Sequence, residues 1–476
     1  MIEQAVGRIR KLLGLVTPRV ETLLPSSTGK AVNALRNSSN FRESAGNALY
    51  CVAEYMAQPL SMLVAAPFLV HKLGLSQYGI WMLVTTILGS VGVLSTGFGD
   101  ATVKYVSAYR GQNNPAGVER TIRATLTINA LLGTLFGLLV WSGAPYAVDR
   151  IFKIEPAFLI ASLQAIRISA LILAIRSVES VFVSTLRAFE RYGPAVKLNV
   201  FLRAIVVASA VLLAAVGRGV VAIMIATLFW SALIVILQAI AARRVVGPVN
   251  PLPTFERAAL TEVFSFGCFS WLQALAGIVF NYADRFLLAA LLGTAPLAIY
   301  VLCVQATQPI HGLVAAAFNF VFPHISSRYE AGEIHGPRRV YRLALLSSLG
   351  LSLALAAPLV LFGKPLLTLW MGAAFAGQAH VTLAVLAVAY MILAINIVPH
   401  YTLLALGSVR FVSILNVGGG ILSLAAVVLF VPPLGLVGAA VARLFYGAVT
   451  ALAFLKVKAK LAQTESLPET VAMIGS

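Results

Sequence analysis

Residues 219–241, GVVAIMIATLFWSALIVILQAIA, form the stretch from which the rest of this chain is interpreted. The stretch carries no charged residue, and Arg243 and Arg244 follow it closely. A helix needs about 20 mainly apolar residues to cross the hydrocarbon core of a bilayer. The stretch therefore predicts a membrane-spanning helix with a basic, cytoplasmic end.

The composition of the whole chain agrees with a membrane protein. Of the 476 residues, 59% are hydrophobic and 11% are charged, whereas about a quarter of a soluble domain is charged. These values exclude a soluble globular protein, a disordered chain and a disulfide scaffold. The three cysteines lie singly in apolar runs without metal-ligand spacing, so the sequence predicts no metal site and no disulfide.

Eleven further apolar runs bring the number of predicted spans to twelve. The connections between them are short, and none could hold a soluble catalytic domain. The chain is thus expected to be an all-α integral membrane protein. The predicted spans are 47–70, 78–103, 121–142, 157–183, 194–216 and 219–241, followed by 263–290, 296–322, 341–362, 380–404, 410–431 and 435–455.

The distribution of basic residues predicts the orientation. With both termini cytoplasmic, the cytoplasmic segments hold 26 of the 35 Lys and Arg residues and the outer loops hold five. The other four are counted as lying inside predicted spans, whereas Arg203 and the basic residues near span ends are counted with the cytoplasmic segments. Cytoplasmic loops of membrane proteins are enriched in Lys and Arg, so both termini are predicted to be cytoplasmic. The net charge of +18 then reports orientation in an anionic bilayer rather than nucleic-acid binding.

Segments of the first half of the chain recur in the second half at a nearly constant offset. LGLSQYGIW at 73–81 aligns with LGTAPLAIY at 292–300, an offset of 219. LNV at 198–200 recurs at 415–417, an offset of 217. Each half contains six predicted spans, so both halves enter the membrane from the same side. This pattern predicts two parallel six-helix lobes around a central cleft.

The same pattern divides the chain into five predicted segments. Within the first of them, AVGRIRKLLGLV at 5–16 is basic and amphipathic, as suits a helix on an anionic membrane surface or an ordinary solvated tail. The segments are a cytoplasmic amphipathic and flexible region at 1–46, an N-terminal lobe at 47–241, a cytoplasmic linker at 242–262, a C-terminal lobe at 263–455 and a cytoplasmic tail at 456–476.

Eight ionisable residues inside the predicted spans are the main functional candidates. Inserting a charged residue at the centre of a membrane helix costs about 2.5–3.5 kcal/mol, so each of these residues needs a structural or functional explanation. The two signs balance, so some of these residues can be structural pairs. The acidic set is Glu54, Asp100, Glu179 and Asp284, and the basic set is Arg167, Arg176, Arg285 and Arg443.

Spacing along the helices suggests roles for several of these charges. Asp100 and Lys104 are four residues apart, which favours a local ion pair. Arg176 and Glu179 are three apart, which fits either a structural pair or a cation held in register by a carboxylate. Arg167 lies nine residues before Arg176, so the two face opposite sides of their helix and at most one easily faces a cleft.

The remaining charges leave more alternatives open. Asp284 and Arg285 are adjacent and point about 100° apart on a helix, so one can face the cleft while the other contacts a neighbouring helix. Arg443 either snorkels outward or serves as a cleft cation. Glu54 has no basic partner three or four residues away, so it pairs across helices or stays neutral as a coupling group.

The predicted span 296–322 carries a polar row of Gln305, Gln308 and His311. Amides lining a cleft suit a sugar, although interhelical hydrogen bonding is an equally ordinary use. His311 fits either a packing role or a proton relay. The sequence contains no hydrolase, nucleotide-binding or metal motif, so neither an enzyme nor a resident cofactor is predicted, and coupling to a proton or Na⁺ gradient is left open.

A family resemblance rests on residues 73–109, LGLSQYGIWMLVTTILGSVGVLSTGFGDATVKYVSAY. This run resembles the corresponding region of Wzx-type polysaccharide exporters, in the multidrug/oligosaccharidyl-lipid/polysaccharide (MOP) exporter superfamily. Similar features in the second half are Asp284-Arg285-Phe286 and Phe322-Pro323 with the basic loop after it. The resemblance extends over roughly residues 45–455.

The resemblance implies a flippase for undecaprenyl-pyrophosphate-linked oligosaccharide repeat units in the bacterial inner membrane. It implies alternating access between two lobes, with polysaccharide polymerase, glycosyltransferases and anionic phospholipids as partners. Arg176 and Arg285, with Arg443 as a third cation, are the expected ligands of pyrophosphate or an acidic sugar, because the guanidinium fork matches phosphate. Further cleft and coupling candidates are Glu54, Glu179, Asp284, Gln305, Gln308 and His311.

Three alternatives share much of this pattern. A lipid II flippase of the same superfamily has the same fold, often with two helices more. A multidrug efflux antiporter favours acidic, cation-binding cavities, against which the intramembrane arginines weigh. A non-transporting membrane subunit of a polysaccharide synthase would use the intramembrane charges for structure alone.

Overall fold

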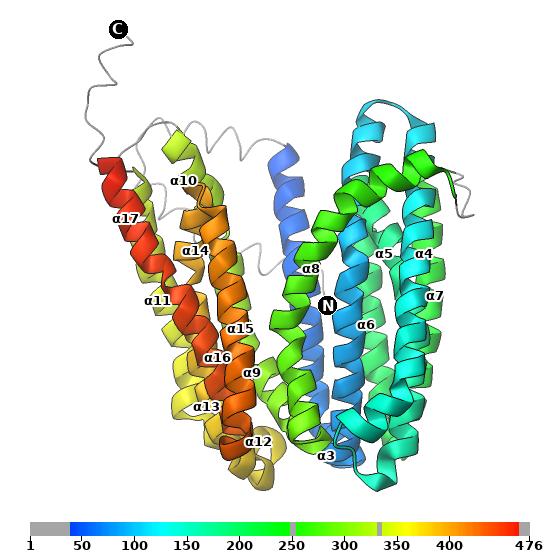
Figure 1. The fold of residues 1–476 in the computed structure, drawn as a ribbon, viewed down its shortest axis with the longest axis vertical. Coiled ribbons are helices and arrows are strands. Elements are labelled where there is room, and N and C mark those ends of the chain that lie inside the picture. Colours follow the sequence, from blue (N-terminus) through cyan, green and yellow to red (C-terminus); the bar gives the residue numbers. More distant parts are fainter. Residues whose placement is uncertain (1–38, 248–253, 331–335, 466–476) are drawn as a thin grey trace. The chain divides into compact units, whose positions relative to one another are not determined.

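A computed structural model of the chain describes residues 39–247, 254–330 and 336–465, and every regular element in these ranges is helical (Figure 1). The chain forms two compact units, residues 1–54 and 55–476. The long helices are α3 Ser39–Gly111, α4 Pro115–Tyr146, α5 Leu159–Ala188, α6 Tyr192–Ala215, α7 Val220–Val246, α8 Arg257–Leu291, α9 Thr294–Phe318, α11 Gly336–Leu361, α13 Ala373–Ile395, α15 Val409–Leu434 and α16 Leu436–Ala451. Shorter helices are α10 Val321–Glu330, α12 Gly363–Met371, α14 Ile397–Ala405 and α17 Ala453–Glu465.

The protein is an all-α, multi-pass membrane protein. In the described ranges, nine helical segments are long and apolar enough to cross a membrane. Each coincides with one predicted span. The other three predicted spans fall in α3 and α8, which include residues whose side chains are not described, so the count of twelve stays a prediction. The boundaries of the five predicted segments also stay a prediction, and the stretch 5–16 lies outside the described residues.

Two predicted spans lie within the single long helix α3, and a glycine explains how. Gly74 has a φ of 76° and a ψ of 162°, so the helix is broken there into two arms. Glycine reaches positive φ without the steric penalty that other residues meet. The break falls in the predicted connection between spans 47–70 and 78–103.

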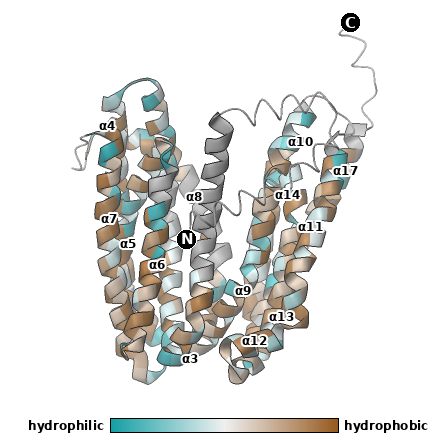
Figure 2. Ribbon diagram, turned by 180° about the vertical axis from the view of Figure 1, so that it is seen from behind, coloured by the Kyte–Doolittle hydropathy of each residue, from teal (hydrophilic) through white to brown (hydrophobic). Residues whose placement is uncertain are grey.

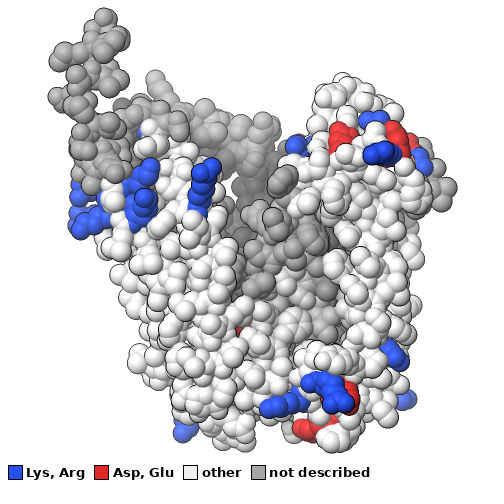
Figure 3. Space-filling model, viewed as in Figure 1, with Lys and Arg blue, Asp and Glu red and all other residues white. Residues whose placement is uncertain are grey.

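Surface character follows the expected membrane pattern. Figure 2 shows hydrophobic residues along α4, α7 and α13. Large apolar side chains on these helices remain exposed, including Leu138 on α4 and Phe229 on α7, as lipid-facing residues are. On the face drawn in Figure 3, Lys and Arg gather toward the helix ends, and the described residues between them are largely uncharged.

The two halves of the chain repeat the same turns and the same helix packing. Residues with positive φ recur at offsets of 219, 217 and 218. The pairs are Gly74 and Gly293, Glu190 and Gly407, and Gly217 and Gly435. In the first half α5 packs on α4 and α7, and α6 packs on α7; in the second half α13 packs on α11 and α16, and α15 packs on α16. The repeat in the sequence is therefore also a repeat in the backbone structure.

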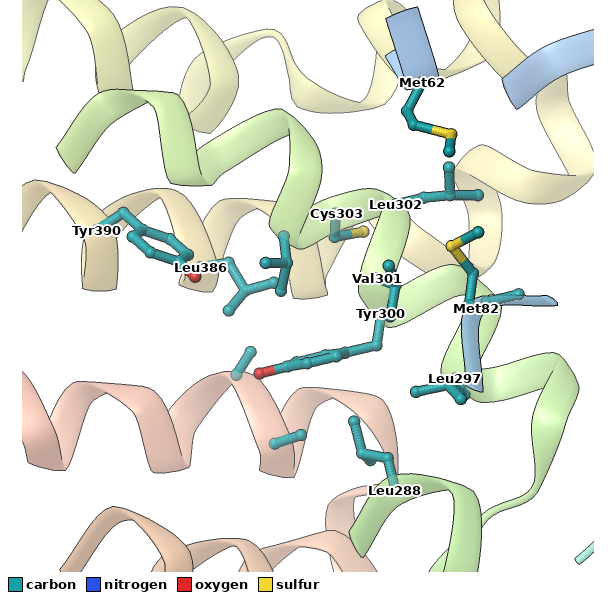
Figure 4. Packing of buried hydrophobic residues seen from close by; sticks show 14 of the residues in the cluster. Met62, Met82, Leu288, Leu297, Tyr300, Val301, Leu302, Cys303, Leu386 and Tyr390 are labelled. Atoms are coloured by element: carbon teal, nitrogen blue, oxygen red, sulfur yellow. The ribbon is translucent and has the colours of Figure 1, made fainter. Parts of the chain in front are cut away.

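Helix α9 lies at the centre of the packed interior. Every residue from Leu297 to Val304 is buried, with at most 4% of its surface exposed. This run is apolar on all sides, which is the pattern of a helix enclosed by others. Figure 4 shows Tyr300, Leu302 and Cys303 of this run among apolar side chains of neighbouring helices. Cys303 is buried here as a small apolar residue, as its apolar run predicts, whereas Cys268 of α8 is exposed and does not follow that prediction.

The contact between α3 and the start of α9 gives a stability prediction. A Cβ at Gly79 would lie 1.9 Å from the carbonyl oxygen of Thr294, and backbone cannot yield as a flexible side chain does. We expect Gly79→Ala to lower the free energy of unfolding by about 1–3 kcal/mol through overpacking. Thermal denaturation of the purified protein in detergent measures this. Gly143→Ala in α4, where nothing lies within 4 Å, is the control, and equal stability of both variants would contradict the contact.

Candidate functional site

A cavity of about 510 Å³ is lined by α3, α5, α6, α7, α8 and α9. Because α8 and α9 belong to the second half of the chain and the others to the first, the cavity lies where the halves meet. We call it the first cavity. Its ionisable lining consists of Asp100, Arg176, Glu179, Arg187, Arg203 and Arg285, with Tyr282 beside them. Among the described lining residues, arginines outnumber carboxylates by four to two.

One stripe of α5 supplies half of that charged lining. Arg176, Glu179, Val183 and Arg187 follow one another at intervals of three or four residues, so helical periodicity turns them toward the same cavity. Arg187 is exposed, whereas Arg176 is partly buried and Glu179 is 8% exposed. The charged stripe therefore runs from an accessible end into the interior of the helix bundle.

Arg176 makes no side-chain hydrogen bond or ion pair with a described residue. Its Nε atom is buried without a hydrogen-bond partner. The Glu179 carboxylate interacts electrostatically with Arg176 and Arg203, yet no ion pair joins Arg176 to Glu179 among the described residues. Of the two predicted roles for this spacing, the structure favours a cation held near a carboxylate rather than a closed structural pair.

Arg167, which also lies on α5, has a different environment from Arg176. The Arg167 guanidinium lies 5.3 Å from the centre of the Trp141 ring, on a face of α5 that does not line the first cavity. A cation above an indole ring is stabilised by the ring quadrupole. The two arginines thus point apart, as their nine-residue separation predicts.

Asp284 and Arg443 form a buried ion pair away from the first cavity. Nη1 of Arg443 donates to Oδ2 of Asp284 at 2.7 Å, and Nη2 donates to the Tyr390 hydroxyl at 3.0 Å. The Tyr300 hydroxyl donates to the same Oδ2 at 2.8 Å. Figure 4 shows Tyr300 and Tyr390 within the packed interior. The side chains of Arg443 and Asp284 are only 15% and 7% exposed, so outward snorkelling of Arg443 is wrong.

Arg285 points differently from its neighbour. Its guanidinium lines the first cavity and lies 5.6 Å from the centre of the Tyr282 ring. Asp284 contacts α9 and α16 instead, as one of the alternatives for this adjacent pair predicts. The structure thus brings Arg176 and Arg285 to one cavity and places Arg443 outside it.

The predicted polar row of α9 does not line a single cleft. Gln305 lines the first cavity, its Nε2 contacts the Met82 sulfur at 3.9 Å, and its buried Oε1 has no hydrogen-bond partner among the described residues. His311 lines a second, smaller cavity, and Gln308 lines neither. His311 follows Gln305 by six residues, so the two side chains point in different directions around the axis of α9 and line different cavities. The side chain of Glu54 lies outside the described residues.

Two sequence-based expectations are corrected. Arg203 was expected among the cytoplasmic residues, but it lies inside the span Lys197–Ala215 and lines the first cavity. Its position near the middle of predicted span 194–216 was the available signal. The local pair of Asp100 with Lys104 does not form. Asp100 interacts electrostatically with Arg187, and Lys104 Nζ lies 3.9 Å from the Phe266 ring centre.

These features define a multi-pass, all-helical membrane protein with a cationic internal cavity. The chain belongs to the family described as polysaccharide biosynthesis protein, which matches residues 69–380. The resemblance to Wzx-type exporters of the MOP superfamily is thereby confirmed.

Two relatives cover most of the chain. EpsK, an uncharacterized membrane protein of Bacillus subtilis strain 168, is 24% identical over 381 residues, which is 74% of this chain and 72% of EpsK. A Shigella flexneri protein named as an O-antigen transporter is 22% identical over 403 residues, which is 83% of this chain and 93% of that protein.

Solved structures share the fold. An inward-facing multidrug resistance MATE family transporter of the MOP superfamily has a TM-score of 0.69 at 16% identity, covering 87% of this chain and 96% of that one. An outward-facing MATE family transporter has a TM-score of 0.59 at 15% identity, covering 91% and 98%. A MOP superfamily transporter from Pyrococcus furiosus has a TM-score of 0.57 at 15% identity, covering 88% and 95%.

The buried pair gives a second stability prediction. Arg443→Gln leaves the Asp284 carboxylate uncompensated, so we expect it to lower the free energy of unfolding by about 3–5 kcal/mol. Adding Asp284→Asn removes the stranded charge and should recover part of that loss. Denaturation in detergent measures both. The control is Arg150→Gln, which breaks an exposed pair with Asp149 and should cost less than about 1 kcal/mol. No recovery in the double variant would contradict the pairing.

Proposed function

We propose that this protein is a flippase that moves undecaprenyl-pyrophosphate-linked oligosaccharide repeat units across the bacterial inner membrane by alternating access, for polysaccharide export. The observation that carries the proposal is the group of four arginines lining one intramembrane cavity. The family of this protein supports a polysaccharide-related cargo, as does the Shigella relative named as an O-antigen transporter.

Electrostatics favour an anionic group in the first cavity. Excess positive charge inside a membrane protein is costly unless a counter-charge accompanies it. A pyrophosphate carries such charge on a compact group, and each guanidinium can donate two parallel hydrogen bonds to phosphate oxygens. Arg176 and Arg285 are the proposed ligands, and Arg203 adds a third nearby cation. Asp100 interacts electrostatically with Arg187, and Glu179 with Arg176 and Arg203, which limits the net charge of the cavity lining.

The cavity favours this cargo over the alternatives. A multidrug antiporter that takes cationic drugs would need an excess of carboxylates, and the lining has the opposite balance. A synthase subunit that used its charges for structure alone would pair them, as Asp284 and Arg443 are paired, whereas Arg176 is left without an ion pair among the described residues. A lipid II flippase would also carry a pyrophosphate, so the arginines fit either glycan-lipid.

Helix α8 supplies contacts on which alternating access would act. Near its start, Val263 packs in a small apolar cluster with Phe98, and Glu262 accepts a hydrogen bond from the Tyr109 hydroxyl at 2.6 Å. Near its end, Asp284 is bound to Arg443. The helix is therefore bound to the first half of the chain at its start and to both halves near its end, where Lys153 also donates hydrogen bonds to the Ala289 and Leu291 carbonyls. Relative movement of the halves would strain or release one of these attachments.

The remaining parts of the proposal concern the setting of the protein. Both termini are proposed to be cytoplasmic, and the basic helix ends are proposed to contact anionic phospholipids. Polymerase and glycosyltransferases are the proposed functional partners, because the cargo must be assembled before transport and polymerised after it. A proton or Na⁺ gradient is the proposed energy source.

Removing the cavity arginines tests the proposal. We expect Arg176→Gln and Arg285→Gln each to weaken binding of inorganic pyrophosphate to the purified protein by about 10- to 100-fold, since each removes charged hydrogen bonds. Polysaccharide export at equal protein level should fall in parallel. Isothermal titration and a complementation assay in a deletion strain measure the two effects.

The matched control for that experiment is Arg167→Gln. This residue also lies on α5 inside the predicted membrane region but contacts Trp141 and does not line the cavity. It should leave binding and export unchanged. If the two cavity variants export polysaccharide as well as this control does, the cationic-cavity proposal fails.

A further inference from the structure

A second cavity of about 260 Å³ lies within the second half of the chain. It is lined by α9 and α13 to α17, and no Asp, Glu, Lys or Arg is among its lining residues. Its main polar groups are His311, Asn396, His400, Tyr401, Asn416 and Tyr446. It is smaller than the roughly 300–1,000 Å³ of typical ligand pockets, so it suits one ring-sized group rather than a long chain.

The second cavity is the internal-repeat counterpart of the first. Lining residues of the two cavities correspond at the offsets that relate the halves. At an offset of 217, Glu179 corresponds to Asn396, Val183 to His400, Ser184 to Tyr401 and Asn199 to Asn416, and at 219 Gly92 corresponds to His311. Repeat-related positions of the two halves thus line the two cavities. The lining of the first cavity includes charged side chains, and that of the second has neutral polar ones.

Hydrogen bonds join residues that line the second cavity to neighbouring helices. The Asn396 amide donates to the Gly447 carbonyl and to the Thr450 hydroxyl, both at 2.9 Å. These bonds tie the break between α13 and α14 to α16. The Tyr446 hydroxyl donates to the Asn416 Oδ1 at 3.4 Å. Hydrogen bonds within the protein therefore fix the positions of these wall residues.

The two imidazoles are the groups left available. Neither His311 nor His400 makes a side-chain hydrogen bond with another described residue, although both line the cavity. No carboxylate is among the described residues that line the cavity, so none there could pair with a charged ring. A neutral imidazole has one donor and one acceptor nitrogen.

We propose that the second cavity binds one uncharged, hydroxyl-bearing sugar residue, through His311 and His400, while the first cavity holds the anionic group. The inference rests on the proposed function, because the sugar belongs to the same transported glycan. A sugar hydroxyl both donates and accepts, which matches a neutral imidazole. Tyr401 and Tyr446, which also line the cavity, have an apolar ring and a polar hydroxyl, a combination that suits a sugar.

Substitution at the histidines separates this proposal from a proton-binding site. Glutamine keeps a donor and an acceptor but cannot ionise, whereas phenylalanine keeps the bulk alone. We expect His400→Phe and His311→Phe to reduce export on the order of tenfold more than His400→Gln and His311→Gln, at equal protein level. The control is His380 of α13, whose ring contacts the Ala376 carbonyl at 3.0 Å and lines neither cavity, so His380→Phe should leave export unchanged.

Either of two results would overturn the inference. Equal loss in the glutamine and phenylalanine variants would mean that the rings must ionise. Equal export in phenylalanine and control variants would mean that the cavity binds nothing needed for transport. Binding of inorganic pyrophosphate is measured on every variant, because an unchanged value shows that the first cavity is intact.

Ligand protection of the histidines tests the sugar directly. The purified full-length protein is treated with diethyl pyrocarbonate in detergent, with free hexoses, N-acetylhexosamines, 6-deoxyhexoses or inorganic pyrophosphate present. Mass spectrometry follows each histidine. We expect at least one neutral sugar to slow modification of His311 and His400 but not of His380, and pyrophosphate to protect neither.

The outcomes separate the two proposals. Protection by pyrophosphate alone, or by none of the sugars, would overturn the sugar site. Protection by a sugar together with pyrophosphate binding that Arg176→Gln does not weaken would support the sugar site and contradict the cationic first cavity.

Discussion

The structure depends on one constraint: a charge inside the apolar interior of a membrane protein needs a compensating group. The chain meets it in two ways. Asp284 and Arg443 compensate each other's charge, and each also makes a hydrogen bond with a tyrosine hydroxyl. The arginines of the first cavity outnumber their carboxylates, and Arg176 makes no ion pair with a described residue. The first arrangement joins helices to one another, and the second is the one proposed to receive an anionic ligand.

Duplication explains how these arrangements coexist in one fold. The two halves share turns with positive φ and the same order of helix packing. Equivalent places therefore arise twice, and each can be given different side chains without altering the backbone. Glu179 in one half and Asn396 in the other occupy such equivalent places. A fold of this kind can present a charged and a neutral polar cavity to different parts of one amphiphilic molecule.

Much of the fold could be predicted from the sequence because hydrophobic length and charge asymmetry are local properties. Nine spans, the all-α class and the apolar setting of Cys303 follow from such properties. The site was harder, because it depends on which side of a helix each charge faces. Periodicity separated Arg167 from Arg176 and Asp284 from Arg285, but Arg203 was assigned to the wrong environment. The partners of Lys104 and Arg443 lie on other helices, and no spacing along the chain identifies them.

The sequence by itself determined that this chain enters a membrane many times, that its halves are related and that a few charges are placed where they are costly. Membrane entry and the cost of buried charge follow from the hydration energy of neighbouring residues, and the relation between the halves follows from comparing segments along the chain. Only the tertiary structure decided which costly charges are paired and which line a cavity. That outcome depends on contacts between residues far apart in the sequence, such as Asp284 with Arg443, 159 positions away.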